Sequence, residues 1–219
     1  EPGNVLITSG SQQALDLIGR VLITPGDRVL TEHPTYTGAI QAFDACQAEY
    51  VTVPFDEEGM RADSLEEAVR TGPKFLYVLP NFHNPGGVTM SPARRTRVVE
   101  LANHYGIPIL EDDPYGQLRY EGKHLPPIVK LDAEAHDCDH GQHAFTGNVI
   151  YLSTFSKILA PGLRIGWVVA PVDVLSKLVQ IKQGADLHTG TFAQMVAYET
   201  AKDGFLDRHV LRIREVYGS

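Results

Sequence analysis

Lys157 is the residue whose surroundings point most clearly to chemistry. It ends the run Ser153-Thr154-Phe155-Ser156-Lys157, which follows an apolar stretch, and Arg164 comes shortly after it. An amine that small apolar neighbours desolvate has a lowered pKa and can attack an aldehyde. Ser, Thr and Arg side chains bind phosphate. Pyridoxal 5'-phosphate (PLP) carries both groups, although a solvated lysine after a strand is the simpler interpretation of Lys157 alone.

A second candidate site lies at Gly10-Ser11-Gln12, between a strand predicted at 5–8 and a helix predicted over 14–22. Backbone N–H groups and the positive end of a helix attract an anion at such a turn. Ser11 as an ordinary N-cap explains the same residues, so both interpretations stay open. Tyr36 follows the next predicted strand, where its ring could lie against a flat cofactor. A packed tyrosine needs no ligand, however, and is the simpler interpretation of Tyr36 alone.

Two further predicted strands end in polar residues. The strand at 75–79 leads into a loop rich in proline and glycine, in which the Asn84 amide can donate a hydrogen bond. The strand at 106–110 leads into Glu111-Asp112-Asp113-Pro114-Tyr115. A carboxylate beside a pyridine nitrogen would keep that nitrogen protonated and make the ring an electron sink. A metal site is the rival interpretation, which the lack of a following histidine at ligand spacing disfavours.

The segment 124–148 is polar and irregular, and we predict a solvated loop there. A cluster that could be interpreted as a metal site lies within it, made of His136, Cys138, His140 and His143 together with Asp137 and Asp139. Their spacing matches no closed zinc pattern. We therefore predict no metal site in this chain.

The composition is that of a soluble globular protein with a real core. The chain has 219 residues, of which 43% are hydrophobic, and a formal net charge of −8. The acidic balance argues against a nucleic-acid partner. No apolar run is long enough to cross a bilayer, and no signal peptide is visible. The two cysteines, Cys46 and Cys138, form no disulfide framework, and we expect a cytoplasmic protein.

Strands alternate with helices along most of the chain. The other strands are predicted at 28–32, 50–54, 149–152 and 165–170, and the other helices at 35–43, 64–70, 92–105, 172–183, 192–202 and 205–216. Ser64 is predicted to open its helix in a capping box. The alternation predicts an α/β domain with a mostly parallel sheet. We see no internal repeat and no boundary, so 1–219 is expected to be one domain.

Four strand-end loops, in this order, resemble those of the fold type I PLP enzymes, specifically the class I and II aminotransferases. They are Gly10-Ser11-Gln12, Asn84-Pro85-Gly86, Asp112 with Tyr115, and Lys157 with Arg164. The runs Thr8–Asp16, Pro34–Phe43 and Lys182–Thr189 are similar to the aminoadipate/kynurenine aminotransferase branch, which includes bacterial lysine-biosynthesis enzymes. The resemblance covers almost the whole chain and implies a three-layer α/β/α fold. It also implies that 1–219 is the large PLP-binding domain alone, without the family's N-terminal segment and C-terminal small domain. Such a fragment would bind PLP weakly and transaminate poorly.

The resemblance implies roles for the site residues. Lys157 would form the aldimine with PLP and shuttle the proton. Asp112 would pair with the pyridine nitrogen, and Tyr36 would stack on the ring. Tyr115 and Asn84 would hydrogen-bond the ring's 3-oxygen. The residues expected to hold the phosphate are Gly10, Ser11, Gln12, Thr154, Ser156 and Arg164.

The implied activity is ping-pong transfer of an amino group from an amino acid to a 2-oxo acid, with 2-oxoglutarate the expected acceptor. The implied assembly is a homodimer in which the segment 186–191 approaches the partner's site. One alternative is another fold type I reaction, such as that of a β-lyase or decarboxylase. A second is the aminotransferase-like sensor domain of a transcription regulator, which requires a basic winged-helix segment before Glu1. A third is a structural domain with an incidental lysine. The sequence does not select the amino-acid donor.

Overall fold

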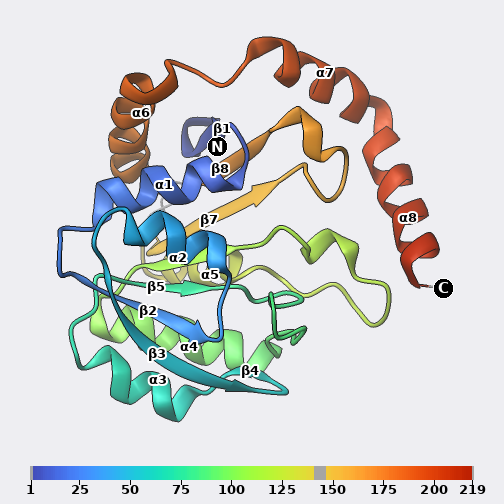
Figure 1. Cartoon of the computed structure of the whole chain (residues 1–219). Coiled ribbons are helices and arrows are strands. Elements are labelled where there is room, and N and C mark those ends of the chain that lie inside the picture. Colours follow the sequence, from blue (N-terminus) through green and yellow to red (C-terminus); the bar gives the residue numbers. More distant parts are fainter. Residues whose placement is uncertain (1, 141–146, 219) are drawn as a thin grey trace.

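The chain forms one mostly parallel sheet with helices on both faces (Figure 1). The computed structural model describes residues 2–140 and 147–218, except for the side chains of 137–140. The strands are β1 (Val5–Thr8), β2 (Arg28–His33), β3 (Glu49–Asp56), β4 (Gly59–Met60), β5 (Phe75–Val78), β6 (Ile109–Asp112), β7 (Val149–Thr154) and β8 (Gly166–Val169). The helices are α1 (Ser11–Leu22), α2 (Thr37–Asp44), α3 (Ala62–Val69), α4 (Pro92–Tyr105), α5 (Ile128–His140), α6 (Val172–Asp186), α7 (Thr191–Ala201) and α8 (Phe205–Gly218).

The strand order in the sheet is β1-β8-β7-β6-β5-β2-β3-β4. Strands β7, β6, β5, β2 and β3 are parallel, whereas β8 runs antiparallel to both of its neighbours and β4 runs antiparallel to β3. The predicted α/β fold with a mostly parallel sheet is therefore confirmed. Ligands of such open sheets bind at the carboxyl ends of the strands, where the strand order reverses.

The sheet is buried on both faces, and each face has its own core. In β5, Phe75 and Tyr77 point into a core formed with α1, α2 and α6. Leu76 and Val78 point into the opposite core, formed with α3, α4 and α5. Because successive side chains of a strand point to opposite faces, a strand covered on both sides reads as one continuous apolar run. The same alternation sends neighbouring residues at a strand's end to different faces.

The prediction of a loop throughout 124–148 is wrong, because α5 lies within it. The backbone N–H groups of Ile128 and Val129, at the start of α5, donate to the Glu111 carboxylate at 2.8 and 2.9 Å. The fully buried Asp132 accepts hydrogen bonds from the Asn103 side chain and from backbone N–H groups at the start of β7. Distant polar partners therefore stabilise this helix, although its own sequence has little apolar periodicity.

The structure describes only part of the cluster of histidine and cysteine residues in the segment 124–148. His136 lies on α5, with Nδ1 2.8 Å from the Asp132 carbonyl oxygen. Cys138, His140 and His143 lie outside the residues whose side chains are described. Among the described residues, no three His, Cys, Asp or Glu side chains gather as metal ligands would.

Two local predictions need correction. Helix α3 begins at Ala62 with Arg61 at its N-cap, so Ser64 lies inside the helix and forms no capping box. Asp63 accepts the Ser64 backbone N–H at 2.8 Å instead. Helix α6 continues past its predicted end at Gln183 to Asp186. None of the helices within 2–140 and 147–218 has the length and apolarity that a membrane crossing requires.

Candidate functional site

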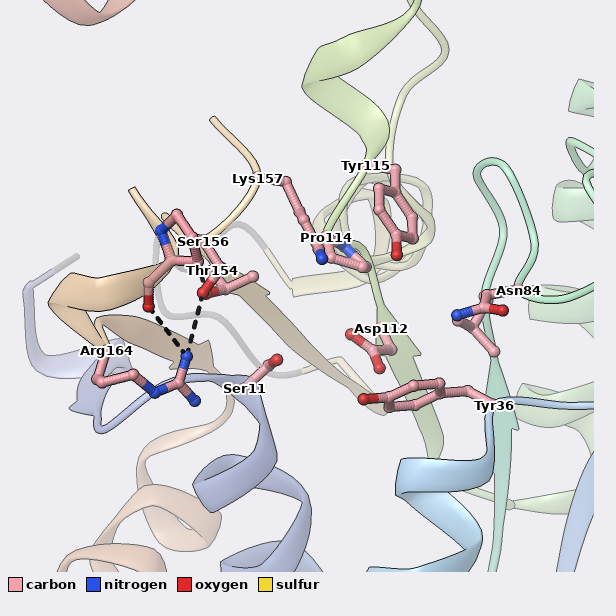
Figure 2. A pocket seen from close by; sticks show the side chains of 12 residues that line it. Ser11, Tyr36, Asn84, Asp112, Pro114, Tyr115, Thr154, Ser156, Lys157 and Arg164 are labelled. Carbon is pink, nitrogen blue, oxygen red and sulfur yellow. Dashed lines mark hydrogen bonds between the residues drawn. The ribbon is translucent and has the colours of Figure 1, made fainter. Parts of the chain in front are cut away.

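The predicted site residues gather around one pocket of about 270 Å³ at the carboxyl ends of the parallel strands (Figure 2). Its lining consists of Ser11, Tyr36, Leu79, Asn84, Asp112, Pro114, Tyr115, Thr154, Ser156, Lys157, Pro161 and Arg164. Of the predicted residues, only Gly10 and Gln12 are absent from this lining. The residues come from segments far apart in the sequence, which the parallel topology brings to one edge of the sheet.

Asp112, at the end of β6, is the buried acid of the pocket. It is 2% exposed, and its Oδ2 accepts a hydrogen bond from the Tyr77 hydroxyl at 2.8 Å. Its Oδ1 is buried without a hydrogen-bond partner among the described residues. Burial raises the pKa of Asp112 to about 7; the Asp113 charge acts in the same direction, and the Tyr77 hydrogen bond opposes it. Buried acceptors nearly always have a donor, so the free oxygen marks a place for a ligand N–H.

Two tyrosines and an amide surround this carboxyl group (Figure 2). The Tyr36 ring folds over Gly38, where an added Cβ would lie 2.6 Å from ring atoms. Burial raises the pKa of the Tyr115 hydroxyl, as do Tyr36 and Asp112, whereas a hydrogen bond with the Asn84 amide lowers it. These side chains provide flat surfaces and hydrogen-bonding groups for a planar polar ligand.

Lys157 is exposed, so the expected desolvation of its amine by apolar neighbours is wrong for the described chain. Lys157 comes from the turn after β7, and its side chain lines the pocket (Figure 2). Its Nζ lies 5.7 Å from the centroid of the Tyr115 ring. The lysine therefore points into the site without being enclosed by it.

The turn after β7 also carries the donors that could hold an anion. Arg164 Nη1 donates to the Ser156 hydroxyl at 3.4 Å and to the Pro161 carbonyl at 3.3 Å (Figure 2). The Thr154 hydroxyl accepts the Ser156 backbone N–H at 3.1 Å and donates to the Ile165 carbonyl at 3.0 Å. Thr154 thus fixes the turn, and Ser156 and Arg164 present their donors to the pocket.

The start of α1 lies beside this cluster. Gly10 is the N-cap, with φ at 85° and no side-chain capping bond, so the interpretation of Ser11 as the N-cap is wrong. The first N–H groups of a helix have no partner within it and can therefore meet an anion. The Gln12 amide instead donates to the Gly38 carbonyl at 2.6 Å and joins α1 to α2. At Gly10, an added Cβ would lie 2.5 Å from Arg164 Nη2.

The three carboxylates that follow one another at the end of β6 have different tasks. Glu111 and Asp113 point to the face opposite Asp112, and burial raises the pKa of Glu111 to about 8, although the α5 N–H groups oppose the rise. Asp113 Oδ1 accepts hydrogen bonds from the Asn81 amide and the Gly116 N–H, both at 2.9 Å. These bonds tie the loop carrying Asn84 to the loop carrying Tyr115.

Arg95 on α4 completes this support, and the sequence reasoning missed it. Its fully buried guanidinium donates to the carbonyls of Met90, Pro80 and Pro126 and to the Asn81 side chain, at 2.7 to 3.0 Å. Tyr77, the partner of Asp112, was missed as well. A tyrosine inside an otherwise non-polar strand and an arginine on the buried side of a helix were the available signals, since both must find partners.

We expect Arg95→Met to destabilise the protein by about 3–5 kcal/mol, because it leaves several buried acceptors without a donor. Arg97→Met is the matched control on the same helix, since Arg97 is about half exposed and pairs with Glu66 and Glu100. It should change stability by less than about 1 kcal/mol. Urea unfolding of both variants measures the difference. Equal effects would show that the Arg95 network contributes no special stability.

A lysine, a buried carboxyl group and an anion-binding turn at the strand ends of a doubly covered sheet define a cofactor-binding α/β domain. The chain belongs to the aminotransferases of class I and II: the family model described as "Aminotransferase class I and II" matches residues 1–215. The fold type I architecture expected from the sequence is thereby confirmed.

Individual relatives agree with this assignment. Aromatic-amino-acid aminotransferase 1 of Thermococcus litoralis is 48% identical over 98% of this chain and 50% of its own length. The crystal structure of LysN, an alpha-aminoadipate aminotransferase of Thermus thermophilus complexed with N-(5'-phosphopyridoxyl)-L-leucine, has a TM-score of 0.92 and 44% identity, and the match covers 99% of this chain and 54% of LysN. The chain thus spans about half the length of these relatives.

A relative of a different kind bears on the second alternative. The uncharacterized HTH-type transcriptional regulator YisV of Bacillus subtilis is 35% identical over 97% of this chain and 42% of its own length. The family's domain therefore occurs in a protein named as a regulator as well as in proteins named as enzymes.

Proposed function

We propose that the protein containing this chain is a PLP-dependent aminotransferase that moves an amino group from an amino acid to a 2-oxo acid. The observation that carries the proposal is the pocket itself. It joins the Lys157 amine, the unpartnered buried oxygen of Asp112 and the Arg164–Ser156 donors. Family membership and the similarity to LysN, whose structure holds a phosphopyridoxyl compound, support it.

The residues present fit PLP. Asp112 Oδ1 would accept the N–H of a protonated pyridine ring, for which it has an open acceptor position. The Tyr36 ring would lie against the cofactor ring, and Tyr115 and Asn84 would hydrogen-bond its 3-oxygen. When bound, PLP supplies an electron sink for the charge that develops at the substrate's α-carbon.

The phosphate would be held where the donors gather. Ser11, Ser156 and Arg164 contribute side chains, and the start of α1 contributes backbone N–H groups at Gly10 and Gln12. Thr154 acts by fixing Ser156. The Lys157 amine, which would meet the cofactor's aldehyde, lines the same pocket.

Lys157 has two tasks in this proposal. Its amine would hold PLP through the cofactor's aldehyde, and in its free form the same amine would take a proton from the substrate's α-carbon and later give it up again. The exposed position of Lys157 leaves the amine room to move between these tasks. With 2-oxoglutarate as the proposed acceptor, the two half-reactions follow ping-pong kinetics. A homodimer in the cytoplasm is the assembly and location that we propose.

The test uses the complete protein. Incubation with PLP followed by borohydride reduction should leave a phosphopyridoxyl group on the peptide that contains Lys157. In a separate, unreduced sample, amino acids alone should give at most one equivalent of 2-oxo acid per site, and continued turnover should require 2-oxoglutarate. An adduct on other lysines alone, or none at all, would overturn the proposal.

The similarity to YisV favours a second candidate, a PLP-binding sensor domain of a transcription regulator. That protein would also give the adduct on Lys157. It would bind a specific DNA fragment and transfer no amino group. The amino-transfer assay therefore separates the two candidates.

We expect Gly10→Ala to lower PLP affinity about tenfold, because the new methyl group displaces the Arg164 guanidinium from the phosphate position. Gly26→Ala is the control for backbone strain. Gly26 has nearly the same φ, 87°, but no atom lies within 4 Å of its added Cβ. Both variants place an alanine at a positive φ, but only Gly10→Ala meets Arg164, so PLP titration should separate them. Equal affinities would contradict the role of Arg164.

A further inference from the structure

A partly buried charged network lies directly behind the turn between β1 and α1. At its centre is Lys182 on α6, which is 4% exposed. Its Nζ donates to both Asp186 carboxylate oxygens, at 2.8 and 2.7 Å, and to the Gln13 side-chain oxygen at 3.0 Å. The Gln13 amide nitrogen closes the ring by donating to Asp186 at 2.7 Å. Three side chains thus share four hydrogen bonds, two of which join α6 to α1 through Gln13.

The network is hydrogen-bonded to Ser9, the residue before Gly10. The Ser9 backbone N–H donates to the Gln13 side-chain oxygen at 2.8 Å, and the Ser9 hydroxyl donates to Asp186 at 3.3 Å. The Ser9 and Thr189 hydroxyls are 3.4 Å apart, and the Thr189 hydroxyl also donates to the Ile7 carbonyl at 3.3 Å. Both sides of the turn are therefore held by groups that contribute nothing to the pocket lining.

A carboxylate at this position is unfavourable if its task is only to stabilise the fold. Asp186 ends α6, where the negative end of the helix dipole disfavours a carboxylate. Burial raises the pKa of Asp186, but hydrogen bonds from Gln13, Lys182 and Ser9 outweigh it, so the pKa is lowered and the group is ionised. Apolar residues of similar volume commonly replace a buried ion pair without loss of stability. What they cannot replace is the directional hold on the Ser9 N–H and hydroxyl.

We propose that Lys182, Asp186 and Gln13 are positioning residues that set the β1–α1 turn to receive a phosphate group, and so make the site selective for a phosphorylated cofactor. The inference rests on the proposed function and deepens it. The network holds Ser9, and Ser9 in turn positions the proposed phosphate donors after it, namely the N–H groups at the start of α1 and the Ser11 hydroxyl. It touches neither the cofactor ring nor its aldehyde, so its effect is confined to the phosphate.

The experiment compares two aldehydes that differ only in the phosphate. Cofactor-free complete protein is titrated with PLP and with pyridoxal, for wild type, Lys182→Met and Asp186→Asn. We expect each variant to lose about tenfold in PLP affinity, with a change below about threefold for pyridoxal. Inorganic phosphate should compete with PLP less well in the variants than in wild type. Asp186 is about one-quarter exposed, so Asp186→Asn tests the idea even where Lys182→Met does not fold.

A variant with a purely structural defect serves as the control. Val98→Ala removes buried volume from the opposite core and should lower the thermal midpoint while leaving the ratio of PLP to pyridoxal affinity at its wild-type value. A parallel loss of both affinities in the Lys182 and Asp186 variants, or no loss, would overturn the positioning role. Failure of the wild type itself to bind PLP would instead overturn the proposed function.

Discussion

Replacing Lys157 by alanine should lower the rate of amino transfer at least about 10⁴-fold while changing stability by less than about 0.5 kcal/mol. The two effects separate because of where the lysine lies. Its side chain is exposed, and no hydrogen bond or ion pair joins its ammonium to the residues that the structure describes. The amine should therefore contribute little to folding, and its proposed role in the chemistry can be measured separately. Steady-state kinetics and thermal unfolding of the complete protein measure both quantities.

Two further variants show which property of Lys157 matters. Lys157→Arg keeps the positive charge, but a guanidinium stays protonated and cannot serve as nucleophile or base, so it should be as inactive as alanine. Lys177→Ala removes another exposed lysine, on α6, and should behave as wild type. Substantial activity of Lys157→Arg would mean that the residue acts through its charge alone.

Much of the fold was predictable because the local signals and the tertiary structure agree. Strand β5 reads as a continuous apolar run and lies buried on both faces. Helix α4 begins with Ser91 and Pro92 and ends at Gly106, and all three behave as helix-end residues should. Helix α5 was missed because its stabilising partners are remote. The Glu111 carboxylate accepts hydrogen bonds from the first N–H groups of α5, although it lies 17 positions earlier in the sequence. A sequence pattern read over the residues of α5 alone does not include that carboxylate.

The site was predictable to the extent that strand ends could be recognised. Parallel strands bring their carboxyl ends to one edge, so locating the strands placed Asp112 and Lys157 near each other. The contacts behind the pocket were beyond reach. Tyr77 meets Asp112 from 35 positions away, and Lys182 meets Gln13 from 169 positions away. Such pairings depend on strand register and helix packing, which single-sequence patterns do not encode.

Asp112→Asn should lower turnover on the order of a hundredfold or more, because an amide cannot supply the negative charge that keeps a pyridine nitrogen protonated. Asparagine is nearly the same size, and it can still accept the Tyr77 hydrogen bond that Asp112 Oδ2 receives in the wild type. Turnover with saturating PLP measures the loss. Glu111→Gln, which changes the buried carboxyl group on the opposite face, should leave turnover close to wild type. If the two variants lost turnover equally, the special role of Asp112 would be refuted.

Asp112→Asn should also stabilise the cofactor-free protein at alkaline pH. Asp112 has a pKa of about 7 in the folded chain, against an ordinary value of 3.8, because burial disfavours its ionised form. Between those two values the unfolded chain has lost a proton that the folded chain retains, so the stability from this group falls as pH rises from about 4 to about 7. An asparagine side chain does not ionise, so its contribution to stability does not change with pH. Wild type and Asp112→Asn should therefore unfold at similar temperatures at pH 4, whereas the variant should be more stable at pH 8 by up to a few kcal/mol.

Glu111 titrates in the same direction, so the comparison must be the difference between wild type and variant at each pH rather than either curve alone. Thermal unfolding of cofactor-free protein across this range provides it. A difference that stays constant with pH would show that Asp112 is not held neutral by burial. The expected result would explain why the residue that we propose to pair with the cofactor ring also costs the cofactor-free protein stability. The buried oxygen without a donor costs stability until a ligand N–H meets it, and that same cost favours binding of a protonated ring.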